Sequence, residues 1–157
     1  MADEKPESTK KEAWLTGTSR YTVYYEDTDF SGYVYHANYL KYFERAREEV
    51  VGIDYLRELY ERRVHFVVAK MGLSFHAPAR HGDLIEVSTR LRLSASPVGL
   101  AQQEASSIPR QGNGPRTLLV SAEIKLVAVN GEGEAIRVPA DVVEHFLGLA
   151  RQAGAIP

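Results

Sequence analysis

The sequence predicts an α+β domain in which one antiparallel β-sheet wraps around a long central helix. Three observations carry this prediction: a single strongly apolar helical pattern lies near the N-terminus, about four alternating strands follow it, and no internal repeat divides the chain. An apolar helix of that length must be covered. One antiparallel sheet with an apolar face is the simplest cover.

The composition is that of one ordinary domain. The chain has 157 residues, of which 44% are hydrophobic and 25% charged, so it can bury a core. Its net charge of −2 gives no electrostatic argument for binding nucleic acid. The absence of cysteine excludes disulfides, thiolate nucleophiles and cysteine-ligated metal centres. No apolar run reaches the roughly 20 residues of a membrane span. The first residues also lack the apolar core of a signal peptide, so we expect a cytoplasmic protein.

The N-terminal third contains the long helix. Residues 1–16 are polar and aperiodic, and we expect them to form a disordered tail. Alternating aromatic and β-branched residues predict a strand over residues 20–25. A helix is then predicted from about His36 to Gly52. Its apolar face recurs at steps of four, three and four residues: Tyr39, Phe43, Ala46 and Val50. Tyr35, Leu40 and Tyr42 widen this face.

The remainder reads mostly as strands. Gly52 is a plausible left-handed C-cap before a short helix over residues 53–62. Alternation then predicts four strands, over residues 66–75, 84–95, 100–107 and 118–128. A closing helix is predicted over residues 139–151 and a C-terminal tail over residues 152–157, which leaves one domain over residues 17–151. One sheet cannot cover a helix on all sides, so we expect a homo-oligomer, a dimer or a homotetramer.

Acidic residues crowd the turn between the first strand and the long helix. Glu26, Asp27 and Asp29 precede Ser31-Gly32, and like charges this close raise one another's pKa or demand a cation. Three interpretations compete: turn or N-cap residues, a divalent metal site, and a catalytic carboxylate. Magnesium or calcium would want more oxygen ligands than the chain offers nearby.

The start of the long helix adds a second chemical feature to this turn. Unpaired N–H groups and the positive end of the helix dipole make a natural oxyanion site there. Such donors beside a carboxylate are what acyl transfer requires. His36 at this point is equally well explained as a structural histidine.

The run YYEDTDFSGYVYHANYLKYFERAR, residues 24–47, closely resembles the hotdog-fold acyl-CoA thioesterases of the 4-hydroxybenzoyl-CoA thioesterase superfamily, in the Tol–Pal-associated branch. The family form D-x-D-x-x-G-x-V-Y-H-x-N-Y, followed by E-R-A-R, is present in register from Asp27 to Arg47. The later PARHGD stretch, residues 78–83, is similar to a family turn. The resemblance implies a hotdog fold and hydrolysis of an acyl-CoA thioester to free acid and coenzyme A. It implies no metal and no cofactor, and an acyl tunnel beside the central helix.

The resemblance also implies roles by position. Asp29 matches the catalytic carboxylate, which attacks the thioester carbonyl or activates a water. The backbone N–H of His36 matches the donor that polarises the carbonyl, and its side chain matches a supporting histidine. Asp27, Tyr35 and Asn38 are expected to support the site by shaping the loop and the helix start.

Two features depart from the family pattern. Phe30-Ser31 replaces a pair of small residues after the catalytic aspartate, and we expect it to narrow the acyl pocket. The basic cluster that binds nucleotide phosphates has no match around residues 94–99, so coenzyme A would need other cations. The candidates are Arg90, Arg92, Arg80, Lys70 and Arg137, although such residues are more often ordinary surface charge.

Two other functions stay open. One is a hotdog dehydratase or hydratase acting on acyl thioesters, and the other is a non-catalytic module that binds acyl-CoA or an acyl carrier. The sequence does not define the acyl group, because one scaffold of this kind hosts many substrates.

Overall fold

The protein is described by a computed structural model covering residues 13–111 and 113–154. Its elements, in chain order, are β1 (Leu15–Thr22), the 3-10 turn η1 (Tyr25–Asp27), α1 (Asn38–Val51), α2 (Ile53–Glu61), β2 (His65–Phe75), β3 (Leu84–Arg92), β4 (Val98–Ile108), β5 (Thr117–Val129) and α3 (Ala140–Gly154). The predicted order of a strand, a long helix, a short helix, four strands and a closing helix is confirmed.

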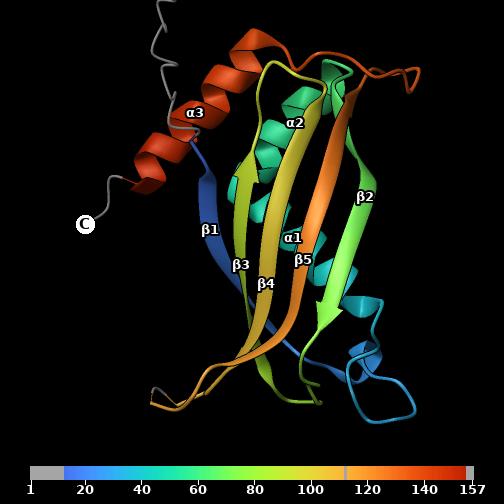
Figure 1. Cartoon of the computed structure of the whole chain (residues 1–157), viewed down its shortest axis with the longest axis vertical. Coiled ribbons are helices and arrows are strands. Elements are labelled where there is room, and N and C mark those ends of the chain that lie inside the picture. Colours follow the sequence, from blue (N-terminus) through green and yellow to red (C-terminus); the bar gives the residue numbers. More distant parts are fainter. Residues whose placement is uncertain (1–12, 112, 155–157) are drawn as a thin grey trace, which may run out of the picture.

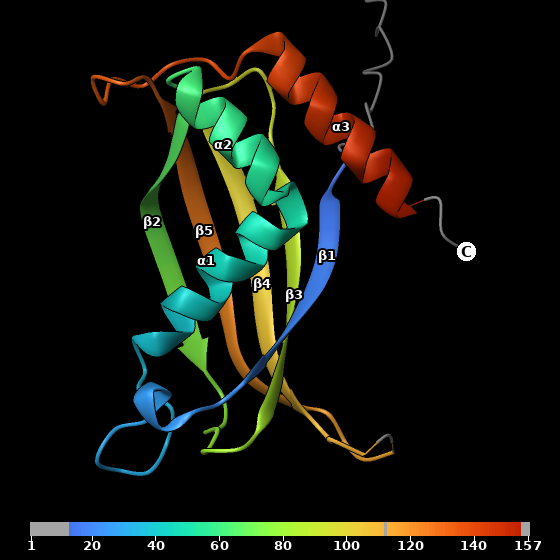
Figure 2. The same ribbon diagram turned by 180° about the vertical axis from the view of Figure 1, so that it is seen from behind.

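All five strands form one antiparallel sheet in the order β1-β3-β4-β5-β2. α1 lies across one face of this sheet, and no helix of the described residues covers the opposite face (Figure 1, Figure 2). The predicted α+β architecture, one sheet wrapped around a long helix, is therefore confirmed.

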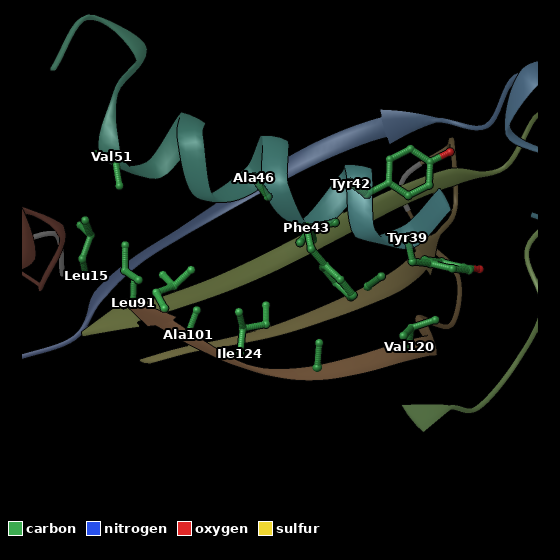
Figure 3. Close-up of a cluster of buried hydrophobic side chains, with 14 of the residues drawn as sticks. Leu15, Tyr39, Tyr42, Phe43, Ala46, Val51, Leu91, Ala101, Val120 and Ile124 are labelled. Atoms are coloured by element: carbon green, nitrogen blue, oxygen red, sulfur yellow. The ribbon is translucent and has the colours of Figure 1, made fainter. Parts of the chain in front are cut away.

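The core forms where the apolar face of α1 meets the inward side chains of the strands. Tyr39, Phe43 and Ala46 are buried on the helix, as its periodicity predicts, whereas Leu40 is 40% exposed. Inward-facing residues of β3, β4 and β5 lie opposite them, among them Leu91, Ala101, Val120 and Ile124 (Figure 3). The apolar residues that recur every 3.6 residues in the helix and every two residues in the strands thus form a single core.

The first strand differs from the prediction. It begins at Leu15, inside the segment assigned to the tail, and ends at Thr22, after which the chain turns through η1. The first half of this strand has no apolar alternation by which the sequence could predict it. It is a strand because it pairs with β3, from Leu15↔Leu91 onward, and because it lies close to the helix. A Cβ at Gly17 would lie 2.6 Å from Cγ2 of Val50, so a glycine lets α1 approach the strand.

The two ends of the chain show similar shifts. α3 continues to Gly154, three residues beyond the predicted end of the closing helix. The rest of the predicted tails, residues 1–12 and 155–157, lies outside the described residues.

Gly52 separates the two consecutive helices. Its φ is 97°, and its N–H donates to the carbonyl of Glu48 at 2.8 Å, which ends α1 and lets α2 leave in a new direction. The C-cap predicted at Gly52 is confirmed. None of the helices in the described ranges is long and apolar enough to cross a membrane.

β2 is an edge strand whose apolar residues are only partly covered within one chain: Met71 and Leu73 pack against the core, whereas others are exposed. Val67, Val68 and Phe75 are 45%, 48% and 55% exposed, because α1 packs mainly over β1 and β3. An exposed apolar edge strand is unusual unless something covers it. The homo-oligomer expected from the sequence stays a prediction, and this exposed edge is where a second copy could pack.

We predict that Phe43→Ala lowers the free energy of unfolding by about 3–5 kcal/mol, because Phe43 is fully buried between α1 and the sheet. Urea unfolding followed by circular dichroism measures the change. Leu40→Ala, on the exposed side of the same helix, should cost less than about 1 kcal/mol. Equal losses for both variants would contradict the proposed burial of this face.

Candidate functional site

The loop from residue 23 to residue 37 joins β1 to α1 at the end of the sheet opposite α3 (Figure 1). An isolated bridge between Thr28 and Val34 closes its tip, and the N–H of Asp29 donates to the carbonyl of Tyr33 at 3.0 Å. The N–H of Val34 donates to the carbonyl of Ala79 at 2.9 Å. Backbone hydrogen bonds therefore hold the loop against the turn between β2 and β3.

Asp27 connects the end of the strand to the start of the helix. Its side chain is buried; Oδ2 accepts the N–H of Tyr24 at 2.8 Å and Oδ1 accepts the side-chain amide of Asn38 at 2.9 Å. Its carbonyl accepts the N–H of Tyr35 at 2.8 Å. These bonds fix both ends of the loop to a single carboxylate.

Asp29 lies two residues further on and is exposed to solvent. Its Oδ1 accepts both the N–H of Ser31 at 2.8 Å and the Ser31 hydroxyl at 2.5 Å. The hydroxyl and the backbone N–H of Ser31 lower the pKa of Asp29, and the charge of His36 contributes in the same direction. Asp29 is therefore an ionised, accessible carboxylate.

His36 precedes α1, which begins at Asn38 rather than near His36 as the sequence predicts. The difference arises because the N–H of Asn38 still closes a turn onto the carbonyl of Tyr35. In the described part of the chain, the backbone N–H of His36 donates to no acceptor. It lies at the positive end of the α1 dipole and so remains available to an incoming oxygen.

The side chains of His36 and Tyr35 lie on the surface beside this donor. Tyr35 is 47% exposed, and its ring centroid lies 4.5 Å from that of His36. The imidazole also approaches Phe75 on β2 edge-on, at 6.4 Å between centroids. The surface around the N–H is therefore aromatic and partly apolar.

Tyr42 is a site residue that its sequence pattern misses. Its hydroxyl is buried, without a hydrogen-bond partner among the described residues, and burial together with Asp27 raises its pKa. Because tyrosine also widens the apolar helix face, periodicity alone gives no sign that its hydroxyl sits beside Asp27 and Asn38.

The three acidic residues of the turn do not point to a common centre. Asp27 is turned inward, whereas Glu26 and Asp29 are exposed. Across residues 13–111 and 113–154, no three histidine, aspartate or glutamate side chains come together as metal ligands would.

The basic candidates are dispersed within the chain. Arg80 is next to the loop, where its guanidinium carbon lies 5.3 Å from the centroid of the Tyr33 ring. Arg90 and Arg92 both lie over the ring of Trp14. Trp14 directly precedes β1, so this pair lies at the opposite end of β1 from the loop. Lys70 is on the edge strand β2, and Arg137 is in the connection between β5 and α3. One chain therefore brings Arg80 alone of these five to the loop.

A cavity of about 660 Å³ lies beside α1 and α2, against the first residues of β2. Its walls are mostly apolar, but Arg47 of α1 also lines it. Phe30, at the loop tip, is fully exposed and does not line this cavity. The expectation that Phe30-Ser31 narrows an acyl pocket therefore stays a prediction.

Comparison with known sequences identifies relatives across most of this fold. Residues 23–146 match the family model described as the thioesterase-like superfamily. The acyl-CoA thioester hydrolase YbgC of Escherichia coli O6:H1 is 39% identical over 110 residues, which span 69% of this chain and 78% of that protein. The acyl-CoA thioesterase YbgC of Haemophilus influenzae is 33% identical over 79% of this chain and 89% of its own length.

Solved structures give the same picture. A hypothetical protein of Thermus thermophilus, TT1821, has a TM-score of 0.71 and 32% identity over 84% of this chain and 98% of its own. The 4-hydroxybenzoyl-CoA thioesterase of Pseudomonas sp. strain CBS-3 has a TM-score of 0.72 and covers 83% of this chain and 99% of its own. At 21% identity, this second likeness concerns the fold, which is the predicted hotdog arrangement.

We predict that Asp27→Ala destabilises the protein by about 1–3 kcal/mol, because it leaves the N–H of Tyr24 and the amide of Asn38 without their buried acceptor. Thermal and urea unfolding measure the loss. Glu26→Ala is the matched control, since Glu26 is an exposed acid of the same turn. If both variants unfolded at the same denaturant concentration, Asp27 would not anchor the loop.

Proposed function

Because this chain belongs to the thioesterase-like superfamily, we propose that it hydrolyses acyl-CoA thioesters to a free acid and coenzyme A, with Asp29 as the catalytic carboxylate. The names of the YbgC relatives support this reaction. One observation carries the assignment of the site: an ionised, accessible Asp29 shares a short loop with the unpaired N–H of His36 at the positive end of α1.

In the proposed reaction, the thioester carbonyl oxygen lies against the backbone N–H of His36. The hydrogen bond and the helix dipole stabilise the negative charge that develops on this oxygen during attack. Asp29 then acts in one of two ways. It attacks the carbonyl carbon, releases the coenzyme A thiolate and leaves an anhydride for water to cleave, or it takes a proton from a water that attacks directly.

The neighbouring residues support this arrangement. Ser31 orients the Asp29 carboxylate by donating two hydrogen bonds to one of its oxygens, which leaves Oδ2 free of these contacts. Asp27 and Asn38 hold the loop against the helix start. Tyr35 and the His36 ring form the surface next to the reacting carbonyl and complete the site.

The exposed edge of β2 and the open cavity beside α1 support a homo-oligomeric enzyme. A second copy placed along β2 would cover Val67, Val68 and Phe75 and would close the cavity over a bound acyl chain. The phosphates of coenzyme A would then lie at the rim. Arg80 is the candidate cation nearest the loop, and the remaining four would take part only if they were provided by a neighbouring copy.

We predict that Asp29→Asn lowers kcat/KM for acyl-CoA hydrolysis roughly 10²- to 10⁴-fold, because an amide is neither a nucleophile nor a base at this position. Thiol release from a panel of acyl-CoA thioesters measures the loss. Circular dichroism should show an unchanged fold, since Asp29 is exposed. Glu26→Gln, the matched control, should retain activity. Near-wild-type hydrolysis by Asp29→Asn would refute this mechanism. Binding of acyl-CoA by the wild type without thiol release would indicate a binding module instead.

We also predict a shift in the pH profile of Ser31→Ala. The reaction needs ionised Asp29, so activity falls as the pH drops through the pKa of this carboxyl. Removing the Ser31 hydroxyl takes away a donor that lowers this pKa, so the acid limb of kcat/KM should move to higher pH. Ser31→Thr, which keeps a hydroxyl, should leave the limb in place. Coincident acid limbs in the wild type and Ser31→Ala would contradict this assignment.

A further inference from the structure

We propose that the cavity beside α1 takes an acyl chain that ends in a carboxylate, and that Arg47 binds this carboxylate. This inference rests on the proposed function, because it names the substrate class of the same enzyme. It concerns a residue of the E-R-A-R stretch to which no role has been assigned above.

Arg47 is a charged residue in an unusual position. Its exposed fraction is 9%, although arginine is mostly found on protein surfaces. Across the described residues, no carboxylate lies within ion-pair distance of its guanidinium. Burial of an unpaired charge is costly, and it lowers the pKa of Arg47. A residue kept at this cost is a candidate for binding an anion.

A buried network holds the guanidinium in place without any ligand. Nη1 of Arg47 donates to Oε1 of Gln103 at 2.8 Å. The amide of Gln103 donates in turn to the hydroxyl of Thr89 at 2.8 Å and to the carbonyl of Phe43 at 2.9 Å. Gln103 and Thr89 are each 1% exposed, so the orientation of Arg47 is fixed by the core. A preorganised binding group loses little entropy when a ligand arrives.

The remaining donors of Arg47 face the cavity. A guanidinium has five N–H groups, and the hydrogen bond to Gln103 uses one of them. Among the described residues, the Tyr42 hydroxyl is the one fully enclosed side-chain polar atom without a partner. The unpaired nitrogens of Arg47 therefore stay in contact with accessible space, and Arg47 does line the cavity.

The surroundings favour a single carboxylate on an apolar chain. Apolar side chains such as Val51, Leu59 and Leu93 make most of the wall around the guanidinium. Glu44 and Glu48 also line the cavity, and their charge acts on Arg47. Because Arg57 lines the cavity as well, the two arginines balance the two glutamates, and a single carboxylate adds only one net charge, whereas the pyrophosphate of coenzyme A would bring more charge into a mostly apolar space.

The position of Arg47 along the helix fits the far end of an acyl chain. Arg47 follows Asn38, the first residue of α1, by nine residues, which is roughly 14 Å along the helix axis at 1.5 Å per residue. An acyl chain whose thioester lies at the N-terminus of α1 could run beside the helix and place its last carbon at Arg47. Chain length therefore decides whether the contact forms.

The test compares two series of coenzyme A thioesters with the wild-type enzyme. One series carries methyl-terminated acyl chains, and the other carries dicarboxylic acids of the same lengths, from four to sixteen carbons, attached through one carboxyl. We expect kcat/KM to favour the dicarboxylic member about tenfold or more at the chain length that reaches Arg47. No preference at any length would overturn the inference.

Two substitutions locate the effect. Arg47→Gln should reduce the ratio of the two kcat/KM values to about one or below, whereas Arg57→Gln, an exposed arginine of the same cavity, should preserve it. Should Arg47→Gln fail to fold, Gln103→Glu keeps Arg47 and neutralises it with a near-isosteric carboxylate, and it should abolish the preference as well. An unchanged ratio in the folded variant would overturn the inference.

Two further outcomes distinguish the alternatives. If Arg47→Gln weakened inhibition by free coenzyme A as strongly as it weakened the dicarboxylic substrates, Arg47 would bind phosphate and the inference would fail. If methyl-terminated thioesters were hydrolysed in an Asp29-dependent manner without any preference for dicarboxylic ones, this inference would fail and the proposed function would stand. Absence of thiol release from every thioester would instead remove the proposed function.

Discussion

The geometry of the candidate site depends on the buried carboxylate of Asp27. It accepts the N–H of Tyr24 at the end of the strand segment and the amide of Asn38 in the first turn of α1. The two elements belong to different layers of the fold, so no regular hydrogen-bond ladder could join them. Without this side chain, the buried amide of Asn38 and the partly buried N–H of Tyr24 would lack their acceptor, and the loop that contains Asp29 would lose these attachments at both ends.

Asp27 and Asp29 illustrate how burial divides the roles of two identical side chains two residues apart. Both carboxylate oxygens of Asp27 accept hydrogen bonds from within the chain, so this residue stabilises the loop. Asp29 keeps one oxygen away from Ser31 and remains in contact with solvent, where it is ionised and can meet a substrate. Spacing and residue type leave both as members of an acidic cluster, and only the family resemblance assigns them different roles before the structure is known. Their separation needs the inward turn at η1, which has no apolar periodicity to predict it.

Periodicity predicted most of the fold, because the face of α1 with Phe43 and the inward residues of β3 and β5 follow simple repeats. It failed where pairing or close packing decides the structure, as in the first half of β1, where Gly17 contacts Val50. Periodicity also did not predict that Tyr42 and Arg47 place polar groups inside the protein. Both residues occupy positions that a helical pattern explains as core or as surface. Their polar atoms, however, lie next to residues distant in sequence: the Tyr42 hydroxyl beside Asp27, and the Arg47 guanidinium on Gln103.

The placement of polar groups along α1 has a consequence for selectivity. The unpaired N–H of His36 lies just before the helix, and Arg47 lies nine residues into it. A helix is rigid over this length, so the two groups keep a fixed separation. In the proposed complex, the hydrogen bond to Gln103 would keep the guanidinium from moving towards shorter ligands. An arginine on a flexible segment could bind the terminal carboxylate of acyl chains of many lengths. A helix anchored at both points can recognise charge and length together.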